Sequence, residues 1–294
     1  MKRLLSLAAI IAFSTTAHAQ TLKDFIQQVH AYWTAPAEPF RVIGNIHWVG
    51  TKGLGVYLIT GPEGHVLIDT AMPESTGLIK ASIEKLGFKL SDIKLILNSH
   101  AHFDHTGGLA EMKAATGAPL VAGAKDKPLL ESGTYPGQES VDELKFPAVK
   151  VDRTVTDGDV LRVGPIELTA HATPGHSPGC TTWTMPVVEN GEKHGAIFFC
   201  SATVALNRLV GAPTYPGIID DYRKTFAQAP KIPGDVFLTP HAEMFDLEKK
   251  RAAMTAGAPN PFVKPGEFQA FTDGLAKAFD VALAKQQADV STTK

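Results

Sequence analysis

The chain has 294 residues, of which 44% are hydrophobic, and its formal net charge is −2 at pH 7. This length and apolar fraction fit one large α/β unit with a substantial core. The weakly acidic balance, with no basic cluster anywhere, excludes nucleic acid as an expected partner.

The first residues have the composition of a secretory signal peptide. A basic start at Lys2-Arg3 precedes an apolar run from Leu4 to Phe13, and Ala17-His18-Ala19 supplies the small residues of a cleavage site. The apolar run is too short to cross a membrane, and no later stretch approaches the roughly 20 apolar residues that a span requires. We expect residues 1–19 to be removed on export to the periplasm. Residues 20–294 then form one domain with no membrane partner, and the loss of two cations changes its formal charge from −2 to −4.

Hydrophobic periodicity and turn residues predict the elements of the first half of the mature chain. A helix is expected over Thr21–Trp33, where apolar residues recur at helical spacing until Pro36. Further helices are expected over Ser75–Leu86, which stops at Gly87, and over Leu109–Thr116. The predicted strands are Arg41–Val49, Gly55–Ile59, His65–Asp69 and Ile93–Leu97.

The second half repeats this pattern of strands followed by helices. Strands are predicted over Pro119–Ala122, Val160–Arg162, Ile166–His171, Thr181–Val187, Ala196–Phe199 and Asp235–Leu238, and helices over Ile218–Ala227 and Glu267–Lys285. Asn190-Gly191 is the expected turn of a hairpin between the fourth and fifth of these strands. The pattern predicts an α/β protein, an αβ/βα four-layer sandwich whose two central mixed sheets carry helices on their outer faces.

Cys180 and Cys200 are the two cysteines of the chain, and they flank the predicted hairpin. Pairing of its strands places them roughly opposite each other, so an oxidising compartment can join them in a disulfide bond. Two buried free thiols are one alternative, and Cys200 as a metal ligand is another.

The segment His100-Ala101-His102-Phe103-Asp104-His105 directly follows the predicted strand Ile93–Leu97. Imidazole and carboxylate groups suit zinc, and a catalytic zinc site keeps one coordination position open for water. Two such ligand sets side by side can hold two metals and one activated hydroxide. Chance histidines in a polar loop are the alternative, but nothing structural requires this spacing.

Two more histidines complete a plausible ligand count. His176 lies in Thr173-Pro174-Gly175-His176-Ser177-Pro178-Gly179, where proline and glycine fix a tight turn, and His241 follows the short strand Asp235–Leu238. An ordinary loop histidine is the alternative for each. With both included, one metal would take three imidazoles, and the other would take two imidazoles and the carboxylate.

These motifs resemble the metallo-β-lactamase superfamily over nearly the whole mature chain. The resemblance is carried by His100–His105 with Thr106-Gly107-Gly108 after it, by the His176 turn, by His241 and by Leu67-Ile68-Asp69-Thr70. It implies the metallo-β-lactamase fold and two Zn²⁺ per chain. The implied ligands are His100, His102 and His176 for the first zinc, and Asp104, His105 and His241 for the second. Asp104 would also orient the zinc-bound hydroxide that attacks the substrate.

Asp69 is expected behind the ligands, where its hydrogen bonds would hold the ligand loop, because such partners commonly tune metal sites. A purely structural aspartate at the end of a strand is the alternative.

Two differences from other branches of the superfamily narrow the range of substrate classes that the resemblance implies. Glyoxalase-like, lactonase-like and nuclease-like members usually carry a bridging aspartate after the hairpin, where this chain reads Cys200-Ser201-Ala202-Thr203. The first β-lactamase subclass has a cysteine ligand there and an arginine at the position of His105. The combination found here resembles the third subclass of the class B β-lactamases, although a slip of one residue in the alignment would bring Cys200 towards the second zinc.

This resemblance implies a small-molecule partner, a β-lactam, whose hydrolysis confers antibiotic resistance. Ser201 and Thr203 match the hydroxyl residues that hold the substrate carboxylate, with ordinary loop polarity as the alternative. The segment Tyr135–Phe146 and the N-terminal helix, with Phe25 and Trp33, are expected to reach the cleft. We expect a monomer. Another exported dizinc hydrolase, lactonase or phosphodiesterase-like, and a non-enzymatic metal-binding protein are the competing functions.

Overall fold

The structure is a computed structural model that describes residues 27–292. The predicted signal peptide, residues 1–19, lies outside the described residues, and so does the first part of the helix predicted over Thr21–Trp33. The described part of that helix spans residues 27–33. Of the helices described, none combines the length and the apolar character needed to cross a membrane.

Two mixed sheets form the centre of the described chain. In spatial order, the first contains β1 (Phe40–Ile43), β2 (Ile46–Trp48), β3 (Tyr57–Ile59), β4 (His65–Ile68), β5 (Ile93–Leu97), β6 (Leu120–Gly123) and β7 (Arg153–Val155). The second contains β12 (Val236–Leu238), β11 (Glu192–Phe198), β10 (Thr181–Glu189), β9 (Ile166–Ala172) and β8 (Val160–Val163). Strands β4 to β7 are parallel to one another, as are β11 and β12, and the remaining neighbours are antiparallel.

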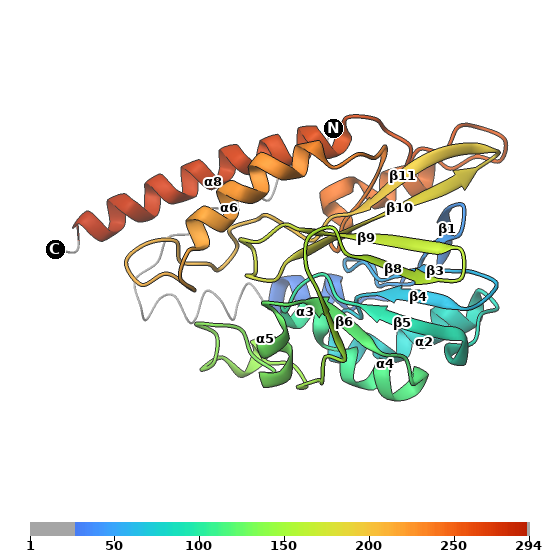
Figure 1. Cartoon of the computed structure of the whole chain (residues 1–294), viewed down its shortest axis with the longest axis horizontal. Coiled ribbons are helices and arrows are strands. Elements are labelled where there is room, and N and C mark those ends of the chain that lie inside the picture. Colours follow the sequence, from blue (N-terminus) through green and yellow to red (C-terminus); the bar gives the residue numbers. More distant parts are fainter. Residues whose placement is uncertain (1–26, 293–294) are drawn as a thin grey trace.

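Helices cover the outer faces of both sheets (Figure 1). On the side of the first sheet lie α2 (Thr76–Lys85), α4 (Leu109–Thr116) and α5 (Lys127–Ser132), with the short α3 (Phe103–Thr106) near its edge. On the side of the second lie α6 (Ile218–Gln228) and the long α8 (Glu267–Thr292). Besides the N-terminal helix, the described part of the chain also contains α7 (Leu247–Ala253) and five 3₁₀ turns at Pro73–Ser75, Leu90–Asp92, Asp142–Leu144, Ala229–Lys231 and Ala242–Phe245. The predicted four-layer sandwich is confirmed.

Strands β4 and β5 are apolar at nearly every position because both of their faces are covered. Val66 and Leu97 point into the core between the two sheets, whereas Leu67 and Ile96 point into the core beneath the helices. Successive side chains alternate between the faces of a strand, and both faces are covered here. The polar residues that follow these strands therefore emerge at the sheet edge.

Two expectations about the strands were wrong. The strand predicted over Arg41–Val49 is two strands, because the backbone reverses at Gly44, which has a left-handed φ of 50°. The strand predicted over Pro119–Ala122 belongs to the first sheet and not to the second half of the fold. It pairs in parallel with β5, and α4 forms the crossover between them.

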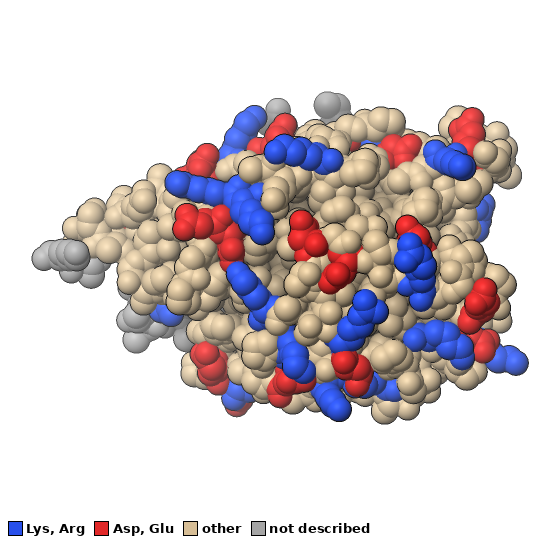
Figure 2. Space-filling model, viewed as in Figure 1, with Lys and Arg blue, Asp and Glu red and all other residues tan. Residues whose placement is uncertain are grey.

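Surface charges of both signs are interspersed on the face drawn in Figure 2. Lysine and arginine side chains alternate there with aspartate and glutamate. Mixed charge of this kind does not produce the single-sign field that attracts polyanions.

The hairpin of β10 and β11 brings its flanking cysteines together. Its register pairs Trp183 with Phe198 about the turn at Asn190-Gly191. Cys180 and Cys200 form a disulfide bond, and both residues are buried. This pairing confirms the predicted bond and excludes the alternatives of two free thiols and of Cys200 as a metal ligand.

Replacing both cysteines by alanine should lower the free energy of unfolding by about 3 kcal/mol. The bond joins residues 20 positions apart, and a loop of this length constrains the unfolded chain by roughly that amount. Urea titration of the oxidised protein and of the Cys180→Ala/Cys200→Ala variant measures the difference. Reduced wild-type protein should unfold like the variant, and identical midpoints for all three samples would contradict the prediction.

Candidate metal centre

The six predicted ligand residues meet at one edge of the sandwich. The connection after β5 supplies His100, His102, Asp104 and His105, the connection between β9 and β10 supplies His176, and the segment after β12 supplies His241. Nitrogen atoms of His100, His102 and His176 lie within 4.8 Å of one another, and so do the ligand atoms of Asp104, His105 and His241. The structure therefore groups the six residues into two sets of three.

Backbone pairing brings His241 from the second sheet to the ligands of the first. The Gly55 amide donates to the Pro240 carbonyl at 2.7 Å, and the Ala242 amide donates to the Gly53 carbonyl at 3.0 Å. The buried Tyr57 hydroxyl donates to the Thr239 carbonyl at 2.7 Å. These bonds fix His241 against the loop between β2 and β3, so its imidazole faces the ligands that follow β5.

The first group presents nitrogen atoms that lack protein partners. His100 Nδ1 lies 2.9 Å from Ser99 Oγ, whereas His100 Nε2 is buried with no hydrogen-bond partner among the described residues. His176 Nδ1 donates to the Thr203 carbonyl at 2.7 Å, which leaves its Nε2 as the acceptor nitrogen. An imidazole whose second nitrogen is fixed in this way is typical of a metal ligand.

The second group brings two imidazole nitrogens and a carboxylate oxygen together. Asp104 Oδ2 lies 3.1 Å from His105 Nε2 and 3.5 Å from His241 Nε2, and these two nitrogens are 3.2 Å apart. Buried imidazoles that converge so closely beside one carboxylate fit a cation.

The electrostatics of the centre favour an ionised carboxylate at Asp104 and neutral imidazoles at every ligand histidine except His105, and these are the forms that bind metal ions. Burial lowers the pKa of His176 to about 4 and that of His241 to about 3. Burial would raise the pKa of Asp104, but its charge interactions and hydrogen bond with the neighbouring histidines hold it well below its ordinary value. The Asp104 carboxylate in turn outweighs burial at His105 and raises its pKa.

Asp69 lies behind the ligand loop. Its carboxylate accepts hydrogen bonds from the Ser99 amide at 2.7 Å, the Ser99 hydroxyl at 2.6 Å and the Asn98 side-chain amide at 3.2 Å. Ser99 also contacts His100, so one residue separates Asp69 from a ligand. Burial raises the pKa of Asp69 to about 6, while its hydrogen bonds act in the opposite direction.

Asp126, which sequence reasoning missed, connects the two loops that carry the first group. This buried carboxylate accepts from the Ala101 amide at 2.9 Å, the Ser177 hydroxyl at 2.6 Å and the Gly179 amide at 2.6 Å. Ala101 separates His100 from His102, and Ser177 follows His176. The available signal was the Asp-Lys-Pro sequence at 126–128, which is typical of a helix start.

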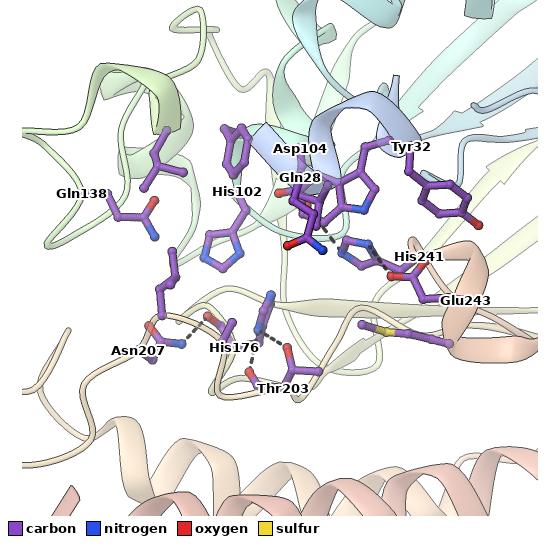
Figure 3. Close-up of a pocket in the computed structure, with 17 residues that line it drawn as sticks. Gln28, Tyr32, His102, Asp104, Gln138, His176, Thr203, Asn207, His241 and Glu243 are labelled. Carbon is purple, nitrogen blue, oxygen red and sulfur yellow. Dashed lines mark hydrogen bonds and ion pairs between the residues drawn. The ribbon is translucent and has the colours of Figure 1, made fainter. Parts of the chain in front are cut away.

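A cavity of about 510 Å³ lies over the two ligand groups (Figure 3). Besides ligand residues, its lining includes apolar side chains of Val29, Trp33, Phe103, Leu144, Leu206 and Met244 and polar side chains of Gln28, Tyr32, Gln138, Thr203, Asn207 and Glu243. The N-terminal helix and the segment Tyr135–Phe146 therefore reach the cavity, as expected. Phe25 lies outside the described residues.

The two predicted substrate contacts differ in their position. Thr203 lines the cavity, whereas Ser201 is buried behind it, with its Oγ 3.3 Å from both the amide nitrogen and the hydroxyl of Thr203. Asn207 also lines the cavity and donates to the His176 carbonyl at 3.0 Å. Thr203 and Asn207 thus fix the His176 turn and face the cavity.

Similarity to known proteins agrees with this geometry. The model of the metallo-beta-lactamase superfamily matches residues 56–188. The crystal structure of BJP-1, a subclass B3 metallo-beta-lactamase of Bradyrhizobium japonicum, is 60% identical with a TM-score of 0.87, and the match covers 89% of this chain and 99% of that one. The native FEZ-1 metallo-beta-lactamase from Legionella gormanii is 38% identical with a TM-score of 0.83, over 86% of this chain and 98% of that one.

Curated relatives match over shorter segments. A hydroxyacylglutathione hydrolase of Rhodospirillum rubrum is 36% identical over 113 residues, which is 38% of this chain and 35% of that protein. The chain thus spans about a third of the length of the curated relatives that it matches first. Taken with the near-complete match to BJP-1, the two ligand groups and the sandwich fold show that the chain belongs to the metallo-β-lactamase superfamily of metal-dependent hydrolases and resembles its subclass B3 members.

Proposed function

We propose that this chain is an exported zinc-dependent β-lactamase that opens the lactam amide of penicillins, cephalosporins and carbapenems. The observation that carries the proposal is the 60% identity that extends over 99% of BJP-1, together with the six grouped ligand residues. The similarity to hydroxyacylglutathione hydrolases covers only 35% of the first of those proteins. It therefore supports a shared superfamily more than a shared substrate.

His100, His102 and His176 would hold one zinc ion, and Asp104, His105 and His241 would hold the other. When bound, the two ions would supply a water of lowered pKa and Lewis acidity towards the lactam carbonyl. Asp104 is the one carboxylate in the two groups, and it would accept a hydrogen bond from the attacking water and orient it. Asp69 and Asp126 would keep the ligand loops in place through the hydrogen bonds described above.

The substrate carboxylate would be bound by neutral groups. Among the described residues, no lysine or arginine lines the cavity. The Thr203 hydroxyl faces the cavity, and Ser201 lies one hydrogen bond behind it. We keep both as the proposed carboxylate contacts, with Ser201 orienting the Thr203 hydroxyl.

The proposal includes a periplasmic location after removal of residues 1–19, and a monomeric catalytic domain formed by residues 20–294. The Cys180–Cys200 disulfide supports an oxidising compartment.

A substrate panel tests this function. The zinc-loaded protein should hydrolyse nitrocefin, benzylpenicillin and imipenem with a larger kcat/KM than S-lactoylglutathione, a simple lactone or bis-p-nitrophenyl phosphate. Preference for the thioester would instead favour the activity named for the curated relatives. Preference for the lactone or the phosphodiester would support another dizinc hydrolase.

Removing residues 21–33 should raise KM for benzylpenicillin more than it lowers zinc content. Gln28, Val29, Tyr32 and Trp33 line the cavity, and the Trp33 ring lies 5.2 Å from that of the ligand His241. Steady-state kinetics and atomic absorption on the same sample separate the two effects. Unchanged kinetics with a lowered melting temperature would show that the helix only packs against the fold.

A further inference from the structure

One acidic side chain stands in the cavity wall apart from the metal ligands. Among the described residues that line the cavity, Glu243 is the only charged side chain besides the ligands. It lies in the 3₁₀ turn Ala242–Phe245, two positions after His241. Because it follows His241 so closely in the chain, the Glu243 carboxylate lies beside the second ligand group.

The Glu243 carboxylate is available to a molecule in the cavity. Its ion-pair partner is the ligand His241, whose Nδ1 lies 3.7 Å from Glu243 Oε1. That distance exceeds a hydrogen bond, and 52% of the Glu243 side chain is exposed. The carboxylate is therefore neither buried nor neutralised by a lysine or arginine of the cavity wall.

The cavity has two chemically different ends. Figure 3 shows Glu243 and Tyr32 at one end, across the ligand residues from Asn207 and Gln138 at the other. The first end carries the negative charge of Glu243. The second carries no charge, because Asn207 and Gln138 are neutral and the buried Asn207 amide is already hydrogen-bonded to His176, Tyr222 and Tyr135. A β-lactam likewise has two different ends, because its ring carboxylate and its acylamino side chain project from opposite sides of the bicyclic core.

We propose that Glu243 makes this enzyme selective for β-lactams whose acylamino side chain carries an ammonium group. This inference rests on the proposed β-lactamase function and deepens it. Repulsion from Glu243 favours placement of the ring carboxylate at Thr203, the contact proposed above, and not beside Glu243. The acylamino side chain then lies beside Glu243, where an ammonium group is attracted and a second carboxylate is repelled.

The expected size of the effect follows from Coulomb's law. Two unit charges about 7 Å apart in a partly exposed site, with an effective dielectric constant between about 20 and 80, change an affinity by about threefold to fiftyfold. An ammonium and a carboxylate at the same position differ by two charges. We therefore expect Glu243 to change the preference between such substrates by about tenfold or more.

Three penicillins provide the test. Benzylpenicillin, ampicillin and carbenicillin share one ring system, and at the same side-chain carbon they carry hydrogen, an ammonium group and a carboxylate. In the Glu243→Gln variant, the ratio of kcat/KM for ampicillin to that for carbenicillin should fall by about tenfold relative to the wild-type enzyme. Benzylpenicillin serves as the uncharged reference within each variant, and zinc content is measured for every sample.

Glu248→Gln is the matched control. Glu248 lies on α7, pairs with Lys52 at 3.6 Å and is 68% exposed outside the cavity, so its substitution should leave the ratio unchanged.

The outcomes separate this inference from the proposed function. Hydrolysis with a ratio that Glu243→Gln does not change would overturn the inference alone. An equal loss on all three penicillins with less zinc would assign Glu243 to holding His241, and would also overturn it. If the zinc-loaded wild-type enzyme hydrolyses none of the three, the proposed function fails and the inference fails with it.

Discussion

Replacing Asp104 by asparagine is expected to lower kcat for benzylpenicillin by more than about a thousandfold, because the second ligand group would lose its metal ion and the attacking water would lose the carboxylate that orients it. A water held by the first group alone would keep a pKa of about 7, so the expected loss is that of the orienting carboxylate and of the second Lewis acid. Asp104 is buried and lies within 3.5 Å of the imidazole nitrogens of His105 and His241. Asparagine retains the shape of the side chain but removes the one negative charge of the group.

Zinc content and kinetics on the same preparation measure this effect. The Asp104→Asn variant should retain about one zinc ion where the wild-type chain holds two. Asp142→Asn is the control, because Asp142 is exposed and pairs with Lys145 on the surface. Wild-type kcat in the Asp104→Asn variant would show that Asp104 is not needed for the reaction.

The second large effect is expected at Asp126. Replacing it by alanine leaves three donors without their acceptor: the buried Ala101 amide and Ser177 hydroxyl, and the partly buried Gly179 amide. Each buried donor without a partner costs about 1–3 kcal/mol, so the free energy of unfolding should fall by about 3 kcal/mol or more. Because both loops of the first ligand group lose a shared anchor, zinc affinity should also fall by about 10-fold to 100-fold.

Urea titration and competition with a zinc chelator measure the two parts of this prediction. Asp126→Asn retains one acceptor oxygen and should give a smaller loss in both measurements. Asp273→Asn, at an exposed position of α8, should change neither. A destabilised Asp126→Ala variant with wild-type zinc affinity would limit Asp126 to a structural role.

The local part of the site could be predicted from the sequence. Four of the six grouped residues lie between His100 and His105, directly after a strand that is apolar because both of its faces are buried. Residues this close in sequence, at the end of a strand with alternating side chains, must lie near one another whatever the rest of the fold is.

The long-range part could not be predicted from residue patterns alone. His241 is held at the centre by the hydrogen bonds of its neighbours Pro240 and Ala242 with Gly55 and Gly53, nearly 190 residues earlier in the chain. Asp126 forms its three bonds with loops that follow two different strands. Neither contact leaves a periodic signal, and His241 was a candidate only from its place after a short strand and from the ligand count, until the resemblance assigned it to the second zinc.

The wall of the cavity was also hard to predict, because it combines short segments from distant parts of the chain. Glu243 and Asn207 face the same cavity, yet each is an ordinary polar residue, the first in a short 3₁₀ turn and the second in a segment without regular structure. Turn backbones such as Gly44 were missed for a related reason, since hydrophobic continuity across Arg41–Val49 concealed a reversal that depends on one left-handed residue.

Zinc titration of the metal-free enzyme tests the central claim most directly. The protein is stripped with a chelator, dialysed, and supplied with zinc in steps while benzylpenicillin hydrolysis is recorded. We predict that hydrolysis ceases on stripping and returns with added zinc up to two equivalents per chain, as the two ligand groups require. Undiminished hydrolysis by protein shown to be free of metal would contradict the account.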